Sequence, residues 1–341
     1  MPSNDGKLSV AVTGPTGEIG KAFIRALERS PAVGEIRGMA RSPFDPADFG
    51  WSRTDYVRGD ILDPHGVQAF IAGADVVVHL AFIIFGGHED SREINLEGSR
   101  NVFEATVASG AERLVYTSSV SAYGFHPDNP QPLTEEVPAR GSEGFYYSAQ
   151  KAELEDALAG VLEGSAVAPY VFRPSIVGGP ESPALVANMP YVRASDALPS
   201  VLSRALGALP TPSPVLPDFG IRLQLVHADD VATALCAAVE GRGEPGAYNL
   251  AASGSLSMAD VAEELGWRSV RLPKSAIDAT AEVIDRLPFT PARAEWIHAL
   301  RVPVVMDTAK ARRELGWRPE HDALETLRET VAGALAAGLV S

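Results

Sequence analysis

A loop with regularly spaced glycines constrains the fold of this 341-residue chain more than any other feature. Residues 12–20 read VTGPTGEIG, and they join a short apolar run to a segment with the pattern of an amphipathic helix. In this context Gly14 permits a tight turn, Gly17 lets a pyrophosphate approach the backbone, and Gly20 lets the helix pack closely on the strand. The phosphates then lie at a helix N-terminus, where free N–H groups and the helix dipole favour anions. The loop therefore predicts a dinucleotide site.

Strand and helix patterns alternate through the first half of the chain. Short, nearly continuous apolar runs indicate strands that are buried on both faces, and segments with apolar residues at helical spacing separate them. The predicted strands are 8–12, 35–39, 55–58, 75–81, 113–118 and 167–172, and the predicted helices are 21–29, 91–109 and 146–162. This order predicts an α/β fold with a doubly wound parallel sheet, the Rossmann fold.

The alternation is lost after Pro174, where a segment rich in Pro, Ala, Leu and Ser begins. Further on, Asp229 and Asp230 are expected to cap a helix, and a strand is predicted at 246–250. The end of the chain, 309–337, is predicted to be mostly helical. We therefore expect a dinucleotide-binding domain of residues 1–177 and 221–252, and a smaller, mostly helical C-terminal substrate domain of residues 178–220 and 253–341.

The composition argues against two classes of protein. The formal net charge of −15 disfavours a nucleic-acid binder, because contacts to phosphates need clustered Lys and Arg. The most apolar run, 76–85, is far shorter than a membrane span and contains His79. The polar start of the chain lacks the apolar core of a signal peptide. We expect a cytoplasmic protein that acts on a small molecule, without nucleic-acid or membrane partners.

The residues after the second and third predicted strands bear on the identity of the dinucleotide. In NAD binders an acidic residue usually ends the second strand and accepts both ribose hydroxyls, but here Arg41 follows that strand and the first carboxylate is Asp45. Arg41 is placed to pair with the 2′-phosphate of NADP; the alternative is a solvated surface arginine. We expect NADP, with NAD as the alternative. Asp60 is expected to accept from the adenine amino group, whereas Asp63 before Pro64 is expected to cap a helix.

Tyr147 and Lys151 place a phenol and an ammonium group one helical turn apart. Positions i and i+4 lie on the same face of a helix, so Lys151 is expected to favour the phenolate and to lower the pKa of Tyr147, which is about 10 in water. A tyrosine of this kind transfers a proton to or from an alcohol or a carbonyl near neutral pH. Ser119 follows the strand 113–118 at the carboxyl edge of the sheet, where ligands bind in such folds.

Together these motifs resemble the extended short-chain dehydrogenase/reductase superfamily, in particular its NAD-dependent epimerases and dehydratases. The resemblance implies that Tyr147 is the acid/base, that Lys151 lowers its pKa and holds the nicotinamide ribose, and that Ser119 hydrogen-bonds the substrate oxygen. It also implies a homodimer. The similarity covers nearly the whole chain and includes, besides the glycine loop and these three residues, Gly59-Asp60, HLA at 79–81, NLEG at 95–98, Tyr123-Gly124, RP at 173–174, VHADD at 226–230 and DTAKARRELGW at 307–317.

Other residues at the same edge of the sheet complete the predicted site. The loop 82–88 begins with four apolar residues, which indicate a pocket wall or core packing. Asn95 is expected to bond the backbone near the site or to be an ordinary polar helix residue. His79 is expected to be a core histidine, His227 to be structural, and no metal site is expected. The predicted cofactor-binding residues are Gly14, Thr16, Gly17, Glu18, Ile19, Arg41, Asp60, Ile61, Leu80, Ala81, Tyr147, Lys151, Pro174 and Val177, and the predicted substrate-binding residues are Phe82, Ile83, Asn95, Ser119 and Ser121.

Three functions are consistent with these motifs. The first is an NAD(P)-dependent oxidoreductase acting on a carbonyl or secondary alcohol of a small, fairly apolar substrate. The second is a nucleotide-sugar epimerase or dehydratase that retains its NAD. The superfamily's sugar-nucleotide enzymes usually carry an arginine four residues before the histidine of the VHADD segment; here Leu223 takes that position and Arg222 lies one residue further back, which turns the side chain to the other face of a strand. The third, a non-catalytic NADP-sensing regulator, has no need of Ser119, Tyr147 and Lys151.

Overall fold

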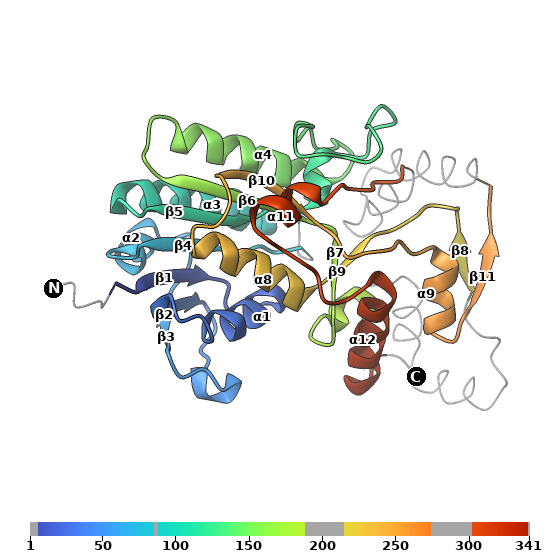
Figure 1. Ribbon diagram of the computed structural model, residues 1–341, viewed down its shortest axis with the longest axis horizontal. Helices are drawn as coiled ribbons and strands as arrows, with labels where there is room; N and C mark the ends of the chain where they lie inside the picture. The colour runs from blue at the N-terminus through green and yellow to red at the C-terminus, as the bar shows by residue number, and fades with distance from the viewer. Residues whose placement is uncertain (1–5, 85–87, 188–214, 274–301, 340–341) are drawn as a thin grey trace.

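A computed structural model describes residues 6–84, 88–187, 215–273 and 302–339 of the chain (Figure 1). A seven-stranded sheet lies at its centre, with the strand order β10-β6-β5-β4-β1-β2-β3 and every neighbouring pair parallel. The predicted doubly wound Rossmann sheet is confirmed. Its strands are β1 (Leu8–Thr13), β2 (Val33–Ala40), β3 (Thr54–Arg58), β4 (Val76–His79), β5 (Arg113–Thr117), β6 (Ala168–Pro174) and β10 (Gly246–Leu250).

Helices cover both faces of this sheet, which is why its central strands are almost entirely apolar and buried. The apolar residues on one face form a core with α2, α3 and α4, and those on the other face form a second core with α1 and α8. The bounds are α1 Glu18–Leu27, α2 Pro64–Ile71, α3 His88–Ser109, α4 Tyr146–Leu162 and α8 Ala228–Val239, with two 3-10 helices, η1 (Pro46–Phe49) and η2 (Val120–Tyr123).

The helix caps agree with the prediction at one end and differ at another. The Asp63 side chain accepts a hydrogen bond from His65 N at 3.1 Å, and the proline after it is the first residue of α2, as predicted. The cap of α8 is His227, whose Nδ1 accepts from Asp229 N at 3.1 Å. The prediction that Asp229 and Asp230 cap this helix is therefore wrong: both lie inside its first turn, where negative charge is favourable.

Most of the rest of the described chain forms a smaller body beside the carboxyl ends of the central strands (Figure 1). It has a core of its own, to which β8, β9, α9 and α12 contribute. Because α8 and β10 return to the large sheet between β9 and α9, the chain crosses between the two bodies more than once. The exact domain boundaries stay a prediction. The elements of the smaller body are the parallel pairs β7 (Ile176–Gly178) with β9 (Leu225–His227) and β8 (Val215–Asp218) with β11 (Arg268–Arg271), and the helices α5 (Pro183–Ala187), α9 (Met258–Glu264) and α12 (Ala323–Ala336). The helix α11 (Ala309–Glu314) instead packs in the core of the large sheet, next to β10.

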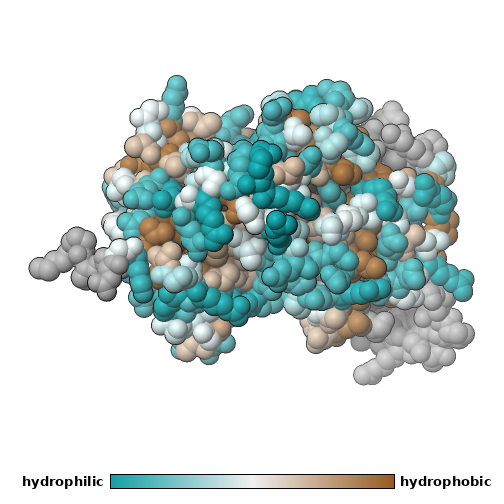
Figure 2. All heavy atoms as spheres, viewed as in Figure 1, coloured by the Kyte–Doolittle hydropathy of each residue, from teal (hydrophilic) through white to brown (hydrophobic). Residues whose placement is uncertain are grey.

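The surface is largely hydrophilic. On the face in Figure 2, hydrophobic residues lie in small separate patches among hydrophilic ones, an ordinary pattern for a protein surface. Among the described residues, no helix combines the length and the apolar character that crossing a membrane requires.

Candidate active site

The predicted site residues gather where the central strands end. β1 and β4 are neighbours in the sheet although β2 and β3 lie between them in the sequence, so the strand order reverses there, and ligands bind in the crevice at such a point. A Cβ atom on Gly14 would lie 2.8 Å from Ala81 N, so the glycine loop after β1 touches the chain after β4. The residues placed along this edge are Gly14, Thr16, Gly17, Glu18 and Ile19 after β1, Arg41 after β2, Asp60 and Ile61 after β3, Leu80 to Ile83 after β4, Ser119 and Ser121 after β5, Pro174 at the end of β6, and Val177 on β7.

The glycine loop has the geometry that a dinucleotide phosphate needs. Gly14 has a φ of +74°, which favours glycine. A Cβ atom on Gly20 would lie 2.2 Å from Gly14 O, so only glycine lets α1 approach the loop. The residue before the helix, Gly17, caps it without a side-chain hydrogen bond, so no cap side chain satisfies the first N–H groups of α1. These donors fit the pyrophosphate of a dinucleotide.

Three further residues lie near the predicted cofactor site. Arg41 is exposed, and its side chain forms no hydrogen bond or ion pair with the described part of the chain. Asp60 Oδ1 accepts from Leu62 N at 3.1 Å, a local turn that does not involve its second carboxylate oxygen. Glu18 is in the first turn of α1, and burial raises the pKa of its carboxyl. The cofactor contacts of these residues stay predictions.

The structure brings Ser119, Tyr147 and Lys151 together at the carboxyl end of β5. The Ser119 hydroxyl lies beside the Tyr147 phenol, near enough to lower the pKa of that phenol. One turn further along α4, Lys151 Nζ donates to Thr117 O at 2.9 Å and lies 3.8 Å from the centroid of the Phe82 ring. All three side chains are buried. The arrangement sets a hydroxyl and a phenol beside each other, ready to bind one oxygen of a substrate.

Burial controls the acid–base properties of this group. It raises the pKa of Tyr147 to about 12, and the Ser119 hydroxyl opposes that rise only in part. Burial also lowers the pKa of Lys151 to about 7, while the negative charge of Glu155 raises it. The expectation that Lys151 lowers the pKa of Tyr147 is therefore wrong in this structure. The ammonium is directed at a backbone carbonyl and an aromatic face, and the loss of water around the phenol outweighs any nearby charge.

The apolar loop after β4 forms a wall beside the phenol. The Phe82 ring meets the Tyr147 ring edge to face, with centroids 5.6 Å apart. Asn95 holds the next residue of the loop, because its Oδ1 accepts from Ile83 N at 2.8 Å and its Nδ2 donates to Ile83 O at 3.0 Å. The second N–H of the amide donates to Gln150 Oε1 at 2.9 Å. Asn95 therefore bonds the backbone near the site, which is one of the two roles predicted for it. Both N–H donors of its amide are used, so neither remains for a substrate.

Several polar residues near the site have structural partners. His79 is fully buried between Thr13 Oγ1 at 2.7 Å and Ser99 Oγ at 2.8 Å, and burial lowers its pKa to about 3, which confirms the predicted core histidine. Ser121 is buried behind Ser119: its N–H donates to Ser119 Oγ at 3.1 Å, and its carbonyl accepts from Ser148 Oγ at 2.6 Å. A substrate contact through the Ser121 side chain stays a prediction.

Glu155, which the sequence analysis does not single out, continues the face of α4 that carries Tyr147 and Lys151. Its Oε1 accepts from Ser118 Oγ at 2.5 Å and from Arg173 Nε at 3.0 Å, and its Oε2 accepts from Arg173 Nη2 at 2.5 Å. The side chains of this ion pair are only 10% and 7% exposed. The spacing of four residues between each of Tyr147, Lys151 and Glu155 is the sequence signal that points to the carboxylate.

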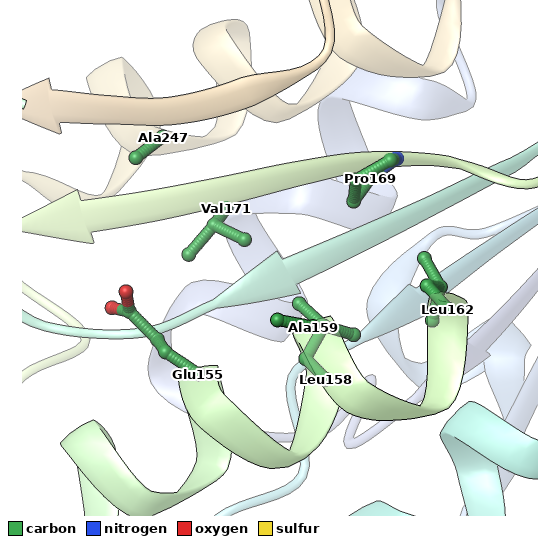
Figure 3. A pocket seen from close by; sticks show the side chains of 7 residues that line it. All are labelled: Glu155, Leu158, Ala159, Leu162, Pro169, Val171 and Ala247. Carbon is green, nitrogen blue, oxygen red and sulfur yellow. The ribbon is translucent and has the colours of Figure 1, made fainter. Parts of the chain in front are cut away.

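Glu155 also lines a pocket of about 210 Å³ between α4 and the strands β6 and β10 (Figure 3). None of the three predicted catalytic residues lines this pocket, so it is separate from the candidate active site. The other lining residues are Leu158, Ala159, Leu162, Pro169, Val171 and Ala247, all apolar.

A group of metal-ligating residue types, His227, His321 and Glu329, meets at the junction of the two bodies, with one ligand atom of each within 4.8 Å of the others. His227 Nδ1 accepts from a backbone N–H, so its Nε2 carries the proton and faces Glu329 Oε2 at 3.2 Å. The two imidazoles are stacked, with centroids 3.9 Å apart and planes inclined by 21°. A metal lies near the plane of each imidazole that binds it, and stacked rings share no such position. The geometry fits a hydrogen-bonded junction.

Comparisons with known proteins bear on the family. A sequence profile of the NAD dependent epimerase/dehydratase family matches residues 10–251. An uncharacterized protein of Mycobacterium tuberculosis is 28% identical over 336 residues, which cover 95% of this chain and 83% of that protein. The 3 beta-hydroxysteroid dehydrogenase type 7 of Homo sapiens is 37% identical over 152 residues, which cover 42% of this chain and 39% of that enzyme.

Solved structures support the same fold. A short-chain dehydrogenase/reductase superfamily protein from Agrobacterium tumefaciens with bound NAD has a TM-score of 0.71 and 19% identity, covering 96% of this chain and 98% of that one. A UDP-glucuronic acid 4-epimerase from Bacillus cereus in complex with NAD has a TM-score of 0.70 and 17% identity, covering 97% and 99%. At these identities the likeness concerns the fold alone.

Proposed function

Because the chain belongs to the NAD-dependent epimerase/dehydratase family of the extended short-chain dehydrogenase/reductase superfamily, we propose that it is an oxidoreductase for a small, apolar carbonyl compound or secondary alcohol. The observation that carries the proposal is the placement of the buried Ser119 hydroxyl beside the buried Tyr147 phenol, with Lys151 one helical turn away. The apolar wall formed by Phe82 supports an apolar substrate. The partial similarity to an enzyme named for a hydroxysteroid points the same way.

The chemistry follows from the charge that develops on the substrate oxygen. A bound nicotinamide supplies or accepts the hydride. As a carbonyl is reduced, the Ser119 hydroxyl donates a hydrogen bond to the developing alkoxide, and Tyr147 transfers its phenolic proton to the same oxygen. With a pKa of about 12, Tyr147 is protonated at neutral pH and suited to act as an acid. In this protonation state the two residues are ready for the reduction of a carbonyl.

We further propose that the cofactor is NADP. The free N–H groups at the start of α1 hold the pyrophosphate, and Lys151 holds the nicotinamide ribose, as in the family. Arg41 supports a 2′-phosphate, because it is exposed beyond β2 and no carboxylate precedes Asp45. The structural relatives named above hold NAD, which is the alternative cofactor. The homodimer and the cytoplasmic location stay predictions.

A nucleotide-sugar epimerase or dehydratase is the second candidate, favoured by the name of the Bacillus cereus relative. Arg222 weighs against it. This side chain is 55% exposed and donates from Nε to Ser255 Oγ at 3.1 Å, while Leu223 pairs with Leu256 through backbone hydrogen bonds. Arg222 is thus engaged on the surface, so it does not supply the arginine expected for a sugar diphosphate.

Net consumption of cofactor tests the proposal. Purified protein is incubated with NADPH or NADH and a panel of ketones that includes 3-ketosteroids, and absorbance is followed at 340 nm. We expect a steady decrease with at least one apolar ketone. Interconversion of UDP-sugars with retained NAD and no net consumption would support the second candidate instead. Tight dinucleotide binding without turnover of either substrate class would support a sensing regulator.

The Tyr147→Phe variant tests the mechanism. It is expected to bind the cofactor with unchanged affinity, measured by fluorescence titration, and to lose roughly 100- to 10,000-fold in kcat, because it removes the general acid. Tyr170→Phe is the matched control, since that phenol donates to Gly243 O at 2.9 Å and contacts no residue of the site. Near-wild-type turnover in Tyr147→Phe would remove the proposed mechanism.

A further inference from the structure

Glu155 takes the third position on a face of α4 whose first two positions are Tyr147 and Lys151. We infer that Glu155 is a positioning residue, which fixes the end of β5 against α4 and presents a negative charge to the Lys151 ammonium. The inference rests on the proposed function, because it assigns a role within the same acid–base site. Glu155 itself does not touch the reacting oxygen in this assignment; it acts through its neighbours.

The first part of the inference concerns position. Glu155 Oε1 accepts from Ser118 Oγ at 2.5 Å, and both of its oxygens accept from Arg173, which lies near the end of β6. Ser118 directly precedes Ser119. One carboxylate thus connects α4 with the ends of two adjacent strands. The placement of the Ser119 hydroxyl relative to Tyr147 therefore depends on Glu155.

The partner of this carboxylate is itself held in place. The Arg173 guanidinium lies 4.4 Å from the centroid of the Tyr123 ring and donates to Val137 O at 3.3 Å. A buried, multiply bonded carboxylate and guanidinium pair has little freedom to rearrange. Glu153 on the same helix forms a contrasting ion pair with Arg92 of α3, and the side chains of Arg92 and Glu153 are 55% and 44% exposed. That surface pair provides a matched control for variants of Glu155.

The second part concerns charge. The titratable groups around Lys151 are Tyr147 and Glu155 on the same face of α4, Tyr116 on β5, and His79 on β4. His79 is neutral because burial lowers its pKa to about 3, and the two phenols are protonated near neutral pH. Glu155 is the anion of this group. Without it, nothing in the group opposes the burial that drives the Lys151 ammonium toward its neutral form.

The effect of Glu155 on the charge of Lys151 is measured by titration, without any substrate. The chain has five lysines, so the ¹³Cε NMR spectrum of lysine-labelled protein is simple, and Lys151→Arg identifies the resonance of Lys151. We expect Glu155→Gln to lower the titration midpoint of Lys151 by about one pH unit or more, and Glu153→Gln to leave it unchanged. If Glu155→Gln does not fold because Arg173 is left unpaired, the double variant with Arg173→Gln is titrated instead. An unchanged midpoint would overturn the electrostatic part of the inference.

The positioning of Ser119 through Ser118 and Glu155 is tested by kinetics. Ser118→Ala removes the link to Ser119 but keeps the buried ion pair, so the protein is expected to fold. We expect kcat to fall about tenfold, with the KM for the cofactor changed less than about twofold, and Ser118→Thr to restore kcat because it keeps the hydroxyl. Wild-type kcat in Ser118→Ala would overturn the positioning role. A wild-type protein without any turnover would refute the proposed function, while the lysine titration would still decide the role of Glu155.

Discussion

Lys151 has lost nearly all contact with water, and its ammonium donates to Thr117 O and faces the Phe82 ring. Burial lowers its pKa from the ordinary value of 10.5 to about 7. In the unfolded chain the lysine binds its proton below pH 10.5, but in the folded protein only below about pH 7. The free energy of unfolding therefore decreases as the pH falls from 10.5 to 7, and below pH 7 it stays lower by a constant amount.

Because the buried Lys151 lowers the stability of the protein at pH 7, we expect Lys151→Met to stabilise it. The pKa shift corresponds to roughly 5 kcal/mol as an upper bound, and the lost hydrogen bond and cation–π contact reduce the gain. We expect the free energy of unfolding at pH 7 to rise by about 2–4 kcal/mol, and the advantage over the wild type to vanish toward pH 10.5. Urea denaturation at several pH values measures it. A variant no more stable than the wild type at pH 7 would contradict the argument.

The preference for NADPH over NADH is expected to depend on one side chain, Arg41. If it binds the 2′-phosphate, Arg41→Ala removes charge-assisted hydrogen bonds of about 1.5–3 kcal/mol. The KM for NADPH should then rise roughly 10- to 100-fold, while the KM for NADH changes less than about twofold. Steady-state kinetics with both cofactors measure the ratio, with the exposed Arg268→Ala as control. An equal rise for both cofactors would refute the phosphate contact.

At the scale of elements, the contact between α1 and its loop depends on Gly20. An added Cβ would lie 2.2 Å from Gly14 O and 2.7 Å from Pro15 O, so Gly20→Ala must push the helix away from the loop. We expect the affinity for the dinucleotide, measured by fluorescence titration, to fall at least about tenfold. Because the displaced groups belong to the backbone, the clash cannot be relieved by a side-chain rotation.

The control for this variant is Gly160→Ala on α4. A Cβ atom there meets nothing within 4 Å, and alanine is a better helix former than glycine, so this variant should gain up to about 1 kcal/mol of stability and keep its affinity for the cofactor. Wild-type affinity in Gly20→Ala would show that α1 can shift without disturbing the phosphate site.

Elements were predictable in proportion to the length of their pattern. The helix 146–162 and the strand 246–250 have the bounds that the sequence predicts. The strands β7 and β9 have three residues each and were not predicted, since three residues cannot display a period. The capping of α8 by His227 was missed because acidic residues follow it.

At the scale of the whole molecule, two properties of the site had different origins. Ser119, Tyr147 and Lys151 were predictable as neighbours, because parallel strands place their carboxyl ends at one edge of the sheet. The direction of the Tyr147 pKa was not predictable, because it depends on how completely Phe82 and the surrounding elements exclude water. Glu155 was missed for a related reason: its partner Arg173 comes from a strand that follows it in the chain.

The C-terminal segment joins the two bodies through Trp317. This side chain is 3% exposed, packs in the same core as the apolar face of α8, and donates from Nε1 to Asp230 O at 2.8 Å. The Asp230 carboxylate accepts from the backbone N–H groups of Glu320 at 2.7 Å and His321 at 3.1 Å. The chain then continues into α12, which contributes to the smaller core. Trp317 thus holds the segment that leads into α12 against the core of the large body.

We therefore expect Trp317→Ala to lower the free energy of unfolding by about 3–5 kcal/mol, and Trp317→Phe, which mainly removes the hydrogen bond, by about 1 kcal/mol. The exposed Leu335→Ala on α12 should change it by less than about 0.5 kcal/mol. Chemical denaturation followed by circular dichroism measures all three. A single transition with a lower midpoint in Trp317→Ala would mean that the two bodies unfold together, because the segment that joins them belongs to both cores. A separate early transition in that variant, with the main midpoint unchanged, would contradict this coupling.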